Sequence, residues 1–193
     1  MCGYLGQISN QKIDKNLLEQ CNENIVCRGP DEKKAYFLDN SVQNSQNINL
    51  NIGFIFNRLS ILDLTEDASQ PMVSKIHNTV LMFNGEIYNH KILRTELENL
   101  NISFESDHSD TEVVLNGISY FGIDFVNKLI GQFSISFIDL NLNKLYLVKD
   151  RVGQKPLFYT KNNDSFFLGS NLKSIKQLSG KTSLDEYQLN KFL

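Results

Sequence analysis

The chain has 193 residues, of which 41% are hydrophobic and 21% charged, and it carries a net charge of −3. This composition is typical of a single globular domain and excludes a disordered or fibrous protein. Acidic and basic residues are interspersed, and neither a signal peptide nor an apolar run of about 18 residues occurs, so we expect no nucleic-acid partner, no membrane span and a cytoplasmic location.

Hydrophobic periodicity and turn residues predict a mixture of strands and helices without a βαβ rhythm. In chain order we expect strand 2–8, helix 12–24, loop 28–31, strand 35–38, loop 40–51, strands 52–56 and 79–83, helices 90–100 and 111–120, strands 132–139, 144–149, 157–159 and 166–168, and helices 171–178 and 184–193. The strands 132–139 and 144–149 form an antiparallel hairpin, and the next two strands pair with each other. Antiparallel strands beside helices predict an α+β fold.

The three cysteines lack the paired spacing of a disulfide framework or zinc site, so no metal site is expected. Cys21 and Cys27 are interpreted as ordinary small thiols. Cys2 differs because removal of Met1 leaves a thiol and a free α-amine on one residue. Such an amine, with an unperturbed pKa of about 7.7–8.0, accepts the thiol proton. Taken alone, an incidental cysteine at a loose chain end is the simpler interpretation.

The run Asn84-Gly85-Glu86 follows the apolar residues 81–83, where we expect the strand to end. An asparagine amide and a glycine N–H at a strand end suit an oxyanion hole, although Asn-Gly is also a common hairpin turn. Arg58 follows another apolar strand and offers a planar fork for a carboxylate, although an arginine there is usually just solvated.

Residues 109–112, Ser-Asp-Thr-Glu, open the predicted helix 111–120. Ser109 and Glu112 have the spacing of a capping box, which explains most of the motif. Asp110 either favours the helix dipole or pairs with a substrate ammonium. Together with an arginine for the carboxylate, such an aspartate recognises the head group of an amino acid.

Seven motifs follow one another along the chain, at 2–3 (Cys-Gly), 28–31 (Arg-Gly-Pro-Asp), 58–63 (Arg-Leu-Ser-Ile-Leu-Asp), 70–71 (Gln-Pro), 84–89 (Asn-Gly-Glu-Ile-Tyr-Asn), 109–112 (Ser-Asp-Thr-Glu) and 150–157 (Asp-Arg-Val-Gly-Gln-Lys-Pro-Leu). In this order they resemble the class II glutamine amidotransferases, most closely the amino-terminal half of glutamine-hydrolysing asparagine synthetases. The resemblance implies an N-terminal-nucleophile hydrolase fold over residues 2–193, a four-layer αββα sandwich with two antiparallel sheets.

The resemblance also implies a reaction, the hydrolysis of L-glutamine to glutamate and ammonia. Cys2 attacks the side-chain amide while its own α-amine relays the proton. Asn84 and the N–H of Gly85 hold the oxyanion. Water then cleaves the γ-glutamyl thioester.

The resemblance assigns five further residues to glutamine binding. Arg58 holds the α-carboxylate, and Asp110, with help from Glu86 or the carbonyl of Gly85, holds the α-ammonium. Leu59 and Ile61, in the same motif as the arginine, complete this set.

The sequence departs from the family at two places. Cys27 stands where a histidine often precedes the Arg-Gly-Pro-Asp run, and Phe56-Asn57 stands where His-Glu often precedes the arginine. Neither position supplies a nucleophile or oxyanion donor, so hydrolysis is expected to survive.

The phosphate loop of the family's synthetase half is absent from these residues. We therefore expect no cofactor in this domain, with ATP and magnesium needed only by a separate ammonia-accepting synthetase domain or subunit. The end of the chain inside the predicted helix 184–193 suggests a domain of a longer parent. Two alternatives stay open, an idle glutamine-binding regulatory module and a hydrolase of another γ-glutamyl amide.

Overall fold

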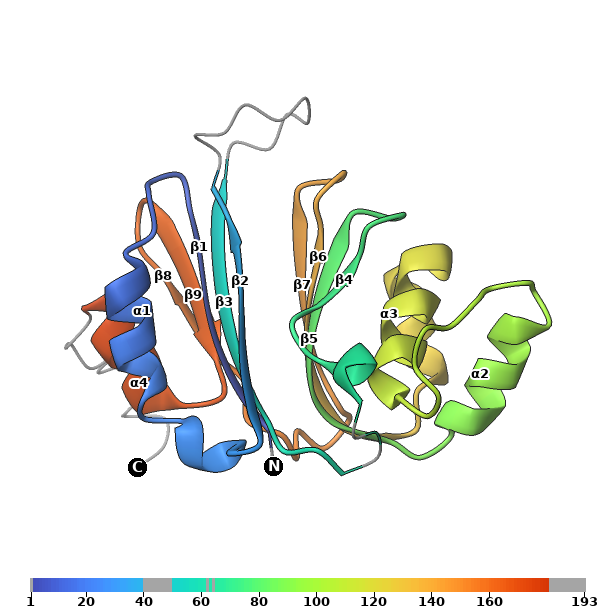
Figure 1. The fold of residues 1–193 in the computed structure, drawn as a ribbon. Helices are drawn as coiled ribbons and strands as arrows, with labels where there is room; N and C mark the ends of the chain where they lie inside the picture. The colour runs from blue at the N-terminus through green and yellow to red at the C-terminus, as the bar shows by residue number, and fades with distance from the viewer. Residues whose placement is uncertain (1, 40–49, 62, 64, 181–193) are drawn as a thin grey trace.

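Two antiparallel sheets lie face to face, and each carries a layer of helices on its outer side (Figure 1). The computed structural model describes residues 2–39, 50–61, 63 and 65–180. The predicted α+β class and four-layer arrangement are confirmed. Most of the predicted loop 40–51 and the whole predicted helix 184–193 lie outside the described residues.

The first sheet has five strands in the order β2-β3-β1-β9-β8. Its strands are β1 (Gly3–Ser9), β2 (Glu32–Leu38), β3 (Asn51–Arg58), β8 (Phe158–Lys161) and β9 (Ser165–Gly169), and its outer helices are α1 (Lys15–Asn22) and α4 (Leu172–Ser179). Both helices begin at a side-chain cap, in which Asp14 accepts from the N–H of Leu17 and Asn171 from that of Ser174. The central strand β1 is buried along almost its whole length and leads directly from Cys2.

The second sheet has four strands in the order β4-β5-β6-β7. Its strands are β4 (Met72–Ser74), β5 (Thr79–Ile87), β6 (Gly131–Asp139) and β7 (Lys144–Lys149), its outer helices are α2 (His90–Glu98) and α3 (Asp110–Phe121), and short 3-10 turns lie at η1 (Val26–Arg28), η2 (Glu66–Ala68) and η3 (Ile123–Lys128). The predicted β6–β7 hairpin and the pairing of β8 with β9 are both confirmed.

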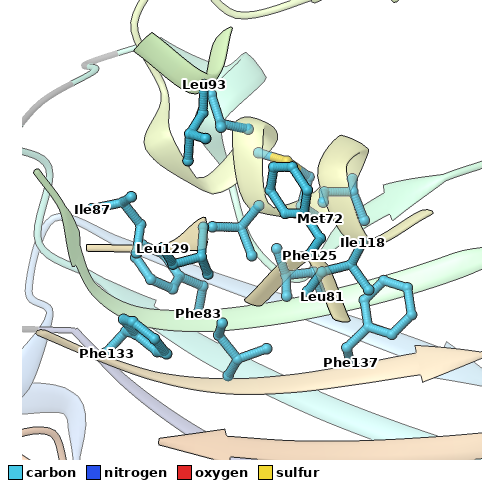
Figure 2. Packing of buried hydrophobic residues seen from close by; sticks show 14 of the residues in the cluster. Met72, Leu81, Phe83, Ile87, Leu93, Ile118, Phe125, Leu129, Phe133 and Phe137 are labelled. Atoms are coloured by element: carbon cyan, nitrogen blue, oxygen red, sulfur yellow. The ribbon is translucent and has the colours of Figure 1, made fainter. Parts of the chain in front are cut away.

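Separate hydrophobic clusters hold the layers together. Figure 2 shows the cluster between the second sheet and its helices, in which Phe83 and Phe133 from the sheet pack near Leu93 and Ile118 from α2 and α3. A second cluster fills the space between the two sheets, and a third lies under α1 and α4. Successive side chains of β5 and β6 therefore alternate between the core under the helices and the core between the sheets.

The predicted end of a strand at Phe83 is wrong, because β5 continues to Ile87. Asn84 and Gly85 lie inside the strand and pair with Ser134 and Phe133 of β6. This excludes the hairpin-turn interpretation of the Asn-Gly pair.

The predicted capping box is also wrong, because the side chain of Ser109 makes no capping bond to α3. Glu112 instead turns to the preceding loop and accepts from the N–H groups of Glu105 and Ser106, at 2.7 and 2.8 Å. The carboxylate thus satisfies backbone donors of a loop that lies beside its helix rather than the donors of the helix itself.

Candidate active site

All eight residues predicted for the site line one pocket of about 280 Å³, which lies where β1 begins and β5 ends. They are Cys2, Arg58, Leu59, Ile61, Asn84, Gly85, Glu86 and Asp110. The pocket is small and polar enough for an amino acid. The structure brings these residues together, and their individual roles stay predictions.

The thiol of Cys2 lies against the backbone of Leu59 in the pocket wall. The N–H of Leu59 donates to its Sγ at 3.4 Å, and the thiol faces the carbonyl of the same residue at 3.7 Å. Burial raises the pKa of the Cys2 thiol, while the Leu59 N–H and the nearby Arg58 guanidinium act in the opposite direction. A thiol with a raised pKa needs a base to become a nucleophile.

The Arg-Gly-Pro-Asp loop fixes the backbone of Cys2 and the segment after β3 that lies against its thiol. Arg28 donates through Nε to the carbonyl of Cys2 at 3.1 Å. Asp31 accepts from the N–H of Ser60 at 2.7 Å, which fixes the segment that follows β3. Gly29 is required here because a Cβ would lie 2.2 Å from the carbonyl oxygen of Asn57.

Asn84 points its side chain into the pocket from β5 and is only 1% exposed. Among the described residues its Nδ2 has no hydrogen-bond partner. A buried amide donor left unpaired costs free energy, on the order of 1–3 kcal/mol, unless a ligand satisfies it. The unpaired donor therefore marks a place for an acceptor atom inside the pocket.

Gly85 presents its backbone to the pocket because β5 has an open edge there. In an antiparallel ladder alternate residues direct their N–H and C=O to the same side. Phe83 bonds Gln70 through both groups on this side, and the N–H of Ile87 donates to Asp110 there at 3.0 Å. Gly85 lies between them and points the same way, past the end of β4, which pairs with β5 only at residues 79–81. A Cβ at Gly85 would lie 2.2 Å from the carbonyl oxygen of Gln132.

Arg58, the last residue of β3, lies in the pocket wall, and its guanidinium is held by hydrogen bonds to protein acceptors. Its Nη1 donates to Glu32 at 3.2 Å and to the carbonyl of Thr65 at 2.9 Å, and its Nη2 donates to the carbonyl of Asp63. The alternative of a simply solvated arginine is wrong, since the residue is only 7% exposed. These contacts fix the plane of the guanidinium before any ligand arrives.

Asp110 lines the pocket from the first turn of α3 and is buried. Burial raises the pKa of its carboxyl to about 6, against the lowering effects of the Ile87 N–H and of His90. A buried carboxylate without a cation beside it is costly, so the site gains from a positively charged ligand.

Eight further residues line the same pocket and were not predicted for the site. They are Asp63, Ala68, Gln70, Phe83, Ser109, Thr111, Gln132 and Lys155. Most stand in or beside the motifs at 58–63, 70–71, 109–112 and 150–157, so the motifs themselves carried a signal. Gln132 and Ala68 stand outside every motif and only the packing of the chain reveals them.

Two of these residues have clear structural tasks. The amide of Gln70 accepts from the N–H of Phe83 at 2.6 Å and donates to its carbonyl at 3.1 Å, which holds β5 next to Asn84. Asp63 accepts from the N–H groups of Thr65 and His108, and these bonds together with Arg58 hold the pKa of its carboxyl below the usual value despite burial.

The two departures from the family pattern lie outside the pocket. Asn57 and Asn22 exchange reciprocal amide bonds of 2.7 and 3.2 Å in the interior, and Cys27 is exposed. In the part of the chain that the structure describes, no group of three or more His, Cys, Asp or Glu side chains is arranged to hold a metal ion. No described helix is long and apolar enough to cross a membrane.

The glutamine amidotransferase domain family model matches residues 1–193 of this chain. The chain belongs to the glutamine amidotransferase domain family. It is 37% identical to asparagine synthetase [glutamine-hydrolyzing] 2 of Bacillus subtilis over 98% of its own length and 25% of that protein. It is 35% identical to asparagine synthetase [glutamine-hydrolyzing] 1 of the same organism over 100% of its own length and 29% of that protein.

Solved structures show the fold of this amidotransferase domain. Glutamine phosphoribosylpyrophosphate amidotransferase from B. subtilis superposes with a TM-score of 0.71 over 92% of the domain and 44% of that chain, at 17% sequence identity. The predicted N-terminal-nucleophile hydrolase fold is thus confirmed. The domain spans only about a quarter of the length of its asparagine synthetase relatives.

Proposed function

We propose that the domain hydrolyses the side-chain amide of L-glutamine through a γ-glutamyl thioester on Cys2. One observation carries the proposal, namely the buried Nδ2 of Asn84, which has no partner among the described residues and lies in the same pocket as a thiol at the second position. A nucleophile beside an unsatisfied donor is the arrangement that acyl transfer requires. A simple glutamine sensor needs neither.

The proposed reaction begins when the α-amine of Cys2, freed by removal of Met1, takes the thiol proton. The sulfur attacks the amide carbon of glutamine, and Nδ2 of Asn84 and the N–H of Gly85 stabilise the oxyanion. The ammonium returns the proton to the leaving nitrogen, so ammonia departs and a thioester remains. Water, activated by the same amine, then attacks the thioester carbon, and glutamate leaves as the thiol is restored.

The charged walls of the pocket suit the head group of the substrate. Arg58, held in plane by the loop carbonyls and Glu32, binds the α-carboxylate. Asp110 binds the α-ammonium with help from Glu86 or the carbonyl of Gly85. Leu59 and Ile61 contact the substrate from the same segment.

Glutamine binding is expected to weaken as the pH falls below 6. The pKa of Asp110 is raised to about 6, chiefly by burial, so below this pH the carboxyl gains a proton and loses the charge that pairs with the ammonium. The dissociation constant is expected to rise about tenfold for each pH unit below 6. Calorimetric titration of Cys2→Ala, which binds without turnover, measures this directly.

Asp110→Asn in the same background is the control for this titration. His90 and Glu86 lie near Asp110 and are unchanged in the control, so a pH dependence that came from either of them would remain. We expect weak binding at every pH and a flat profile. A parent dissociation constant that stays constant between about pH 7 and about pH 5 would contradict the role of Asp110.

The ammonia is proposed to pass to an ATP-dependent synthetase domain or subunit of the asparagine synthetase type. ATP and magnesium belong to that part, and this domain is proposed to need no cofactor of its own. The names and lengths of the relatives support the proposal. We further propose a cytoplasmic location and no nucleic-acid or membrane partner.

Measurement of glutamate and ammonia released from glutamine and from a γ-glutamyl peptide tests the proposal. We expect equal amounts of both products from glutamine and little cleavage of the peptide. Cleavage of the peptide alone favours a hydrolase of another amide. Binding of glutamine without release of either product favours an idle regulatory module and overturns the proposed activity.

A further inference from the structure

Three buried hydroxyl groups meet in the apolar space between the two sheets. Tyr4 of β1 is 0% exposed, and Ser134 and Ser136 of β6 are equally buried. The Tyr4 hydroxyl donates to Oγ of Ser134 at 3.4 Å and accepts from the hydroxyl of Ser136 at 3.2 Å. This hydroxyl cluster therefore links a strand of the first sheet to a strand of the second.

The hydroxyl cluster is surrounded by hydrophobic side chains. The ring of Tyr4 stacks on that of Phe56, with ring centroids 6.1 Å apart and an interplanar angle of 8°. Both rings belong with Val80, Met82 and Leu168 to the hydrophobic cluster between the sheets. Phenylalanine and alanine would fill this space without the cost of burying polar groups. A buried network whose hydrogen bonds are all made allows one relative arrangement of its neighbours. Apolar packing alone is less directional and specifies that arrangement less precisely.

The hydroxyl cluster lies next to the proposed reaction centre on both sheets. Tyr4 is two residues after Cys2, which directly precedes β1, and both side chains pack into the cluster between the two sheets. Ser134 is directly opposite Asn84 in the β5–β6 ladder. The Tyr4–Ser134 bond thus joins the strand of the nucleophile to the strand pair of the oxyanion donor.

We infer that Tyr4 is a positioning residue whose hydroxyl, through Ser134 and Ser136, sets the spacing between Sγ of Cys2 and Nδ2 of Asn84. This inference rests on the proposed glutamine hydrolysis. The two groups reach the pocket from different sheets, so a small shift of one sheet on the other changes their separation directly. Displacements of about 1 Å can lower rates by about a hundredfold.

Tyr4→Phe tests the inference because it removes the hydroxyl and keeps the ring. We expect kcat for glutamine to fall about tenfold and KM to change less, because the ion pairs proposed for the head group weaken only gradually with distance, whereas attack on the amide needs a close approach. The rate at which diazo-oxo-norleucine alkylates Cys2 at saturation should fall by the same factor. Tyr36→Phe is the matched control, since Tyr36 of β2 is half-buried and packs against the hydrophobic cluster between the sheets.

A triple variant, Tyr4→Phe with Ser134→Ala and Ser136→Ala, separates positioning from stability. Tyr4→Phe alone leaves two buried serines without their partner, whereas the triple variant removes all three polar groups and is expected to recover its melting temperature. We expect its kcat to stay about tenfold low, because the directional link is still missing.

Two results would overturn the inference while the proposed function stands. In the first, an active parent loses no rate on Tyr4→Phe. In the second, the triple variant regains the parental kcat together with its stability, which would make the cluster purely structural. A parent that releases no glutamate from glutamine and is not alkylated at Cys2 would instead overturn the proposed function, and this inference with it.

Discussion

Cys2→Ala is expected to abolish glutamine hydrolysis, with a loss in kcat of about 10⁴-fold or more. The substitution removes the only atom that the proposed mechanism uses for attack on the amide. Glutamine binding should persist, because Arg58 and Asp110 stand on other elements of the pocket. Release of glutamate measured at saturating glutamine checks the rate, and calorimetry checks that the site still binds.

Cys27→Ala is the matched control for this variant. Cys27 is exposed and does not line the pocket, so its loss is expected to leave hydrolysis and alkylation unchanged. If Cys2→Ala retained the parental rate, or if diazo-oxo-norleucine labelled Cys27 instead of Cys2, the nucleophile would have been assigned to the wrong residue.

The free α-amine can be tested separately from the thiol. A chain that keeps Met1 carries its amine on the wrong residue, so we expect it to lose hydrolysis as fully as Cys2→Ala. Burial raises the pKa of the Cys2 thiol, and without the amine the fraction present as thiolate at neutral pH is small. Intact mass before the assay shows which form is present. Full activity in a Met1-retaining preparation would contradict the role of the amine as base.

Most of the fold was predictable because the hydrophobic pattern and the turn residues agree along the chain. The hairpin of β6 and β7 follows from two β-rich runs separated by polar residues. The helix α3 follows from apolar residues after a polar start at Asp110. The missed strand β4 has only three residues, too few for periodicity to show.

The residues that line the site could be predicted from the sequence more readily than their arrangement. The end of β5 was placed too early because Asn84 and Gly85 are poor strand formers, and only the neighbouring strand shows why they are tolerated. Gly85 lets the backbones of β5 and β6 approach closely, with the Gln132 carbonyl where a Cβ would lie. The two hydrogen bonds between Gln70 and Phe83 likewise join residues that are 13 positions apart, which no local pattern shows.

The partners and the pKa values of the charged residues could not be predicted from the sequence pattern either. Glu112 has the spacing of a capping residue, yet its carboxylate satisfies the loop at residues 105–106 instead. Two loop donors nearby compete with the donors of the helix, and spacing alone does not decide between them. The raised pKa of Asp110 likewise arises from burial at the meeting point of α3 and β5.

Asn84→Ala is expected to lower kcat about 10²- to 10³-fold with little change in KM, because the lost donor acts on the oxyanion and not on the ground state. The same substitution should leave the melting temperature unchanged or raise it, since Nδ2 is buried without a partner among the described residues. Asn116→Ala is the matched control, because Asn116 is also buried but donates to the carbonyl of Ser103 and does not line the pocket. We expect it to lose stability by about 1 kcal/mol and to keep the parental kcat.

Steady-state kinetics and thermal unfolding of the two variants thus give opposite patterns if Asn84 stabilises the oxyanion. Equal losses of stability with an unchanged kcat in both would show that Asn84 is an ordinary buried asparagine, and the oxyanion would then have to be held by the backbone of Gly85 alone.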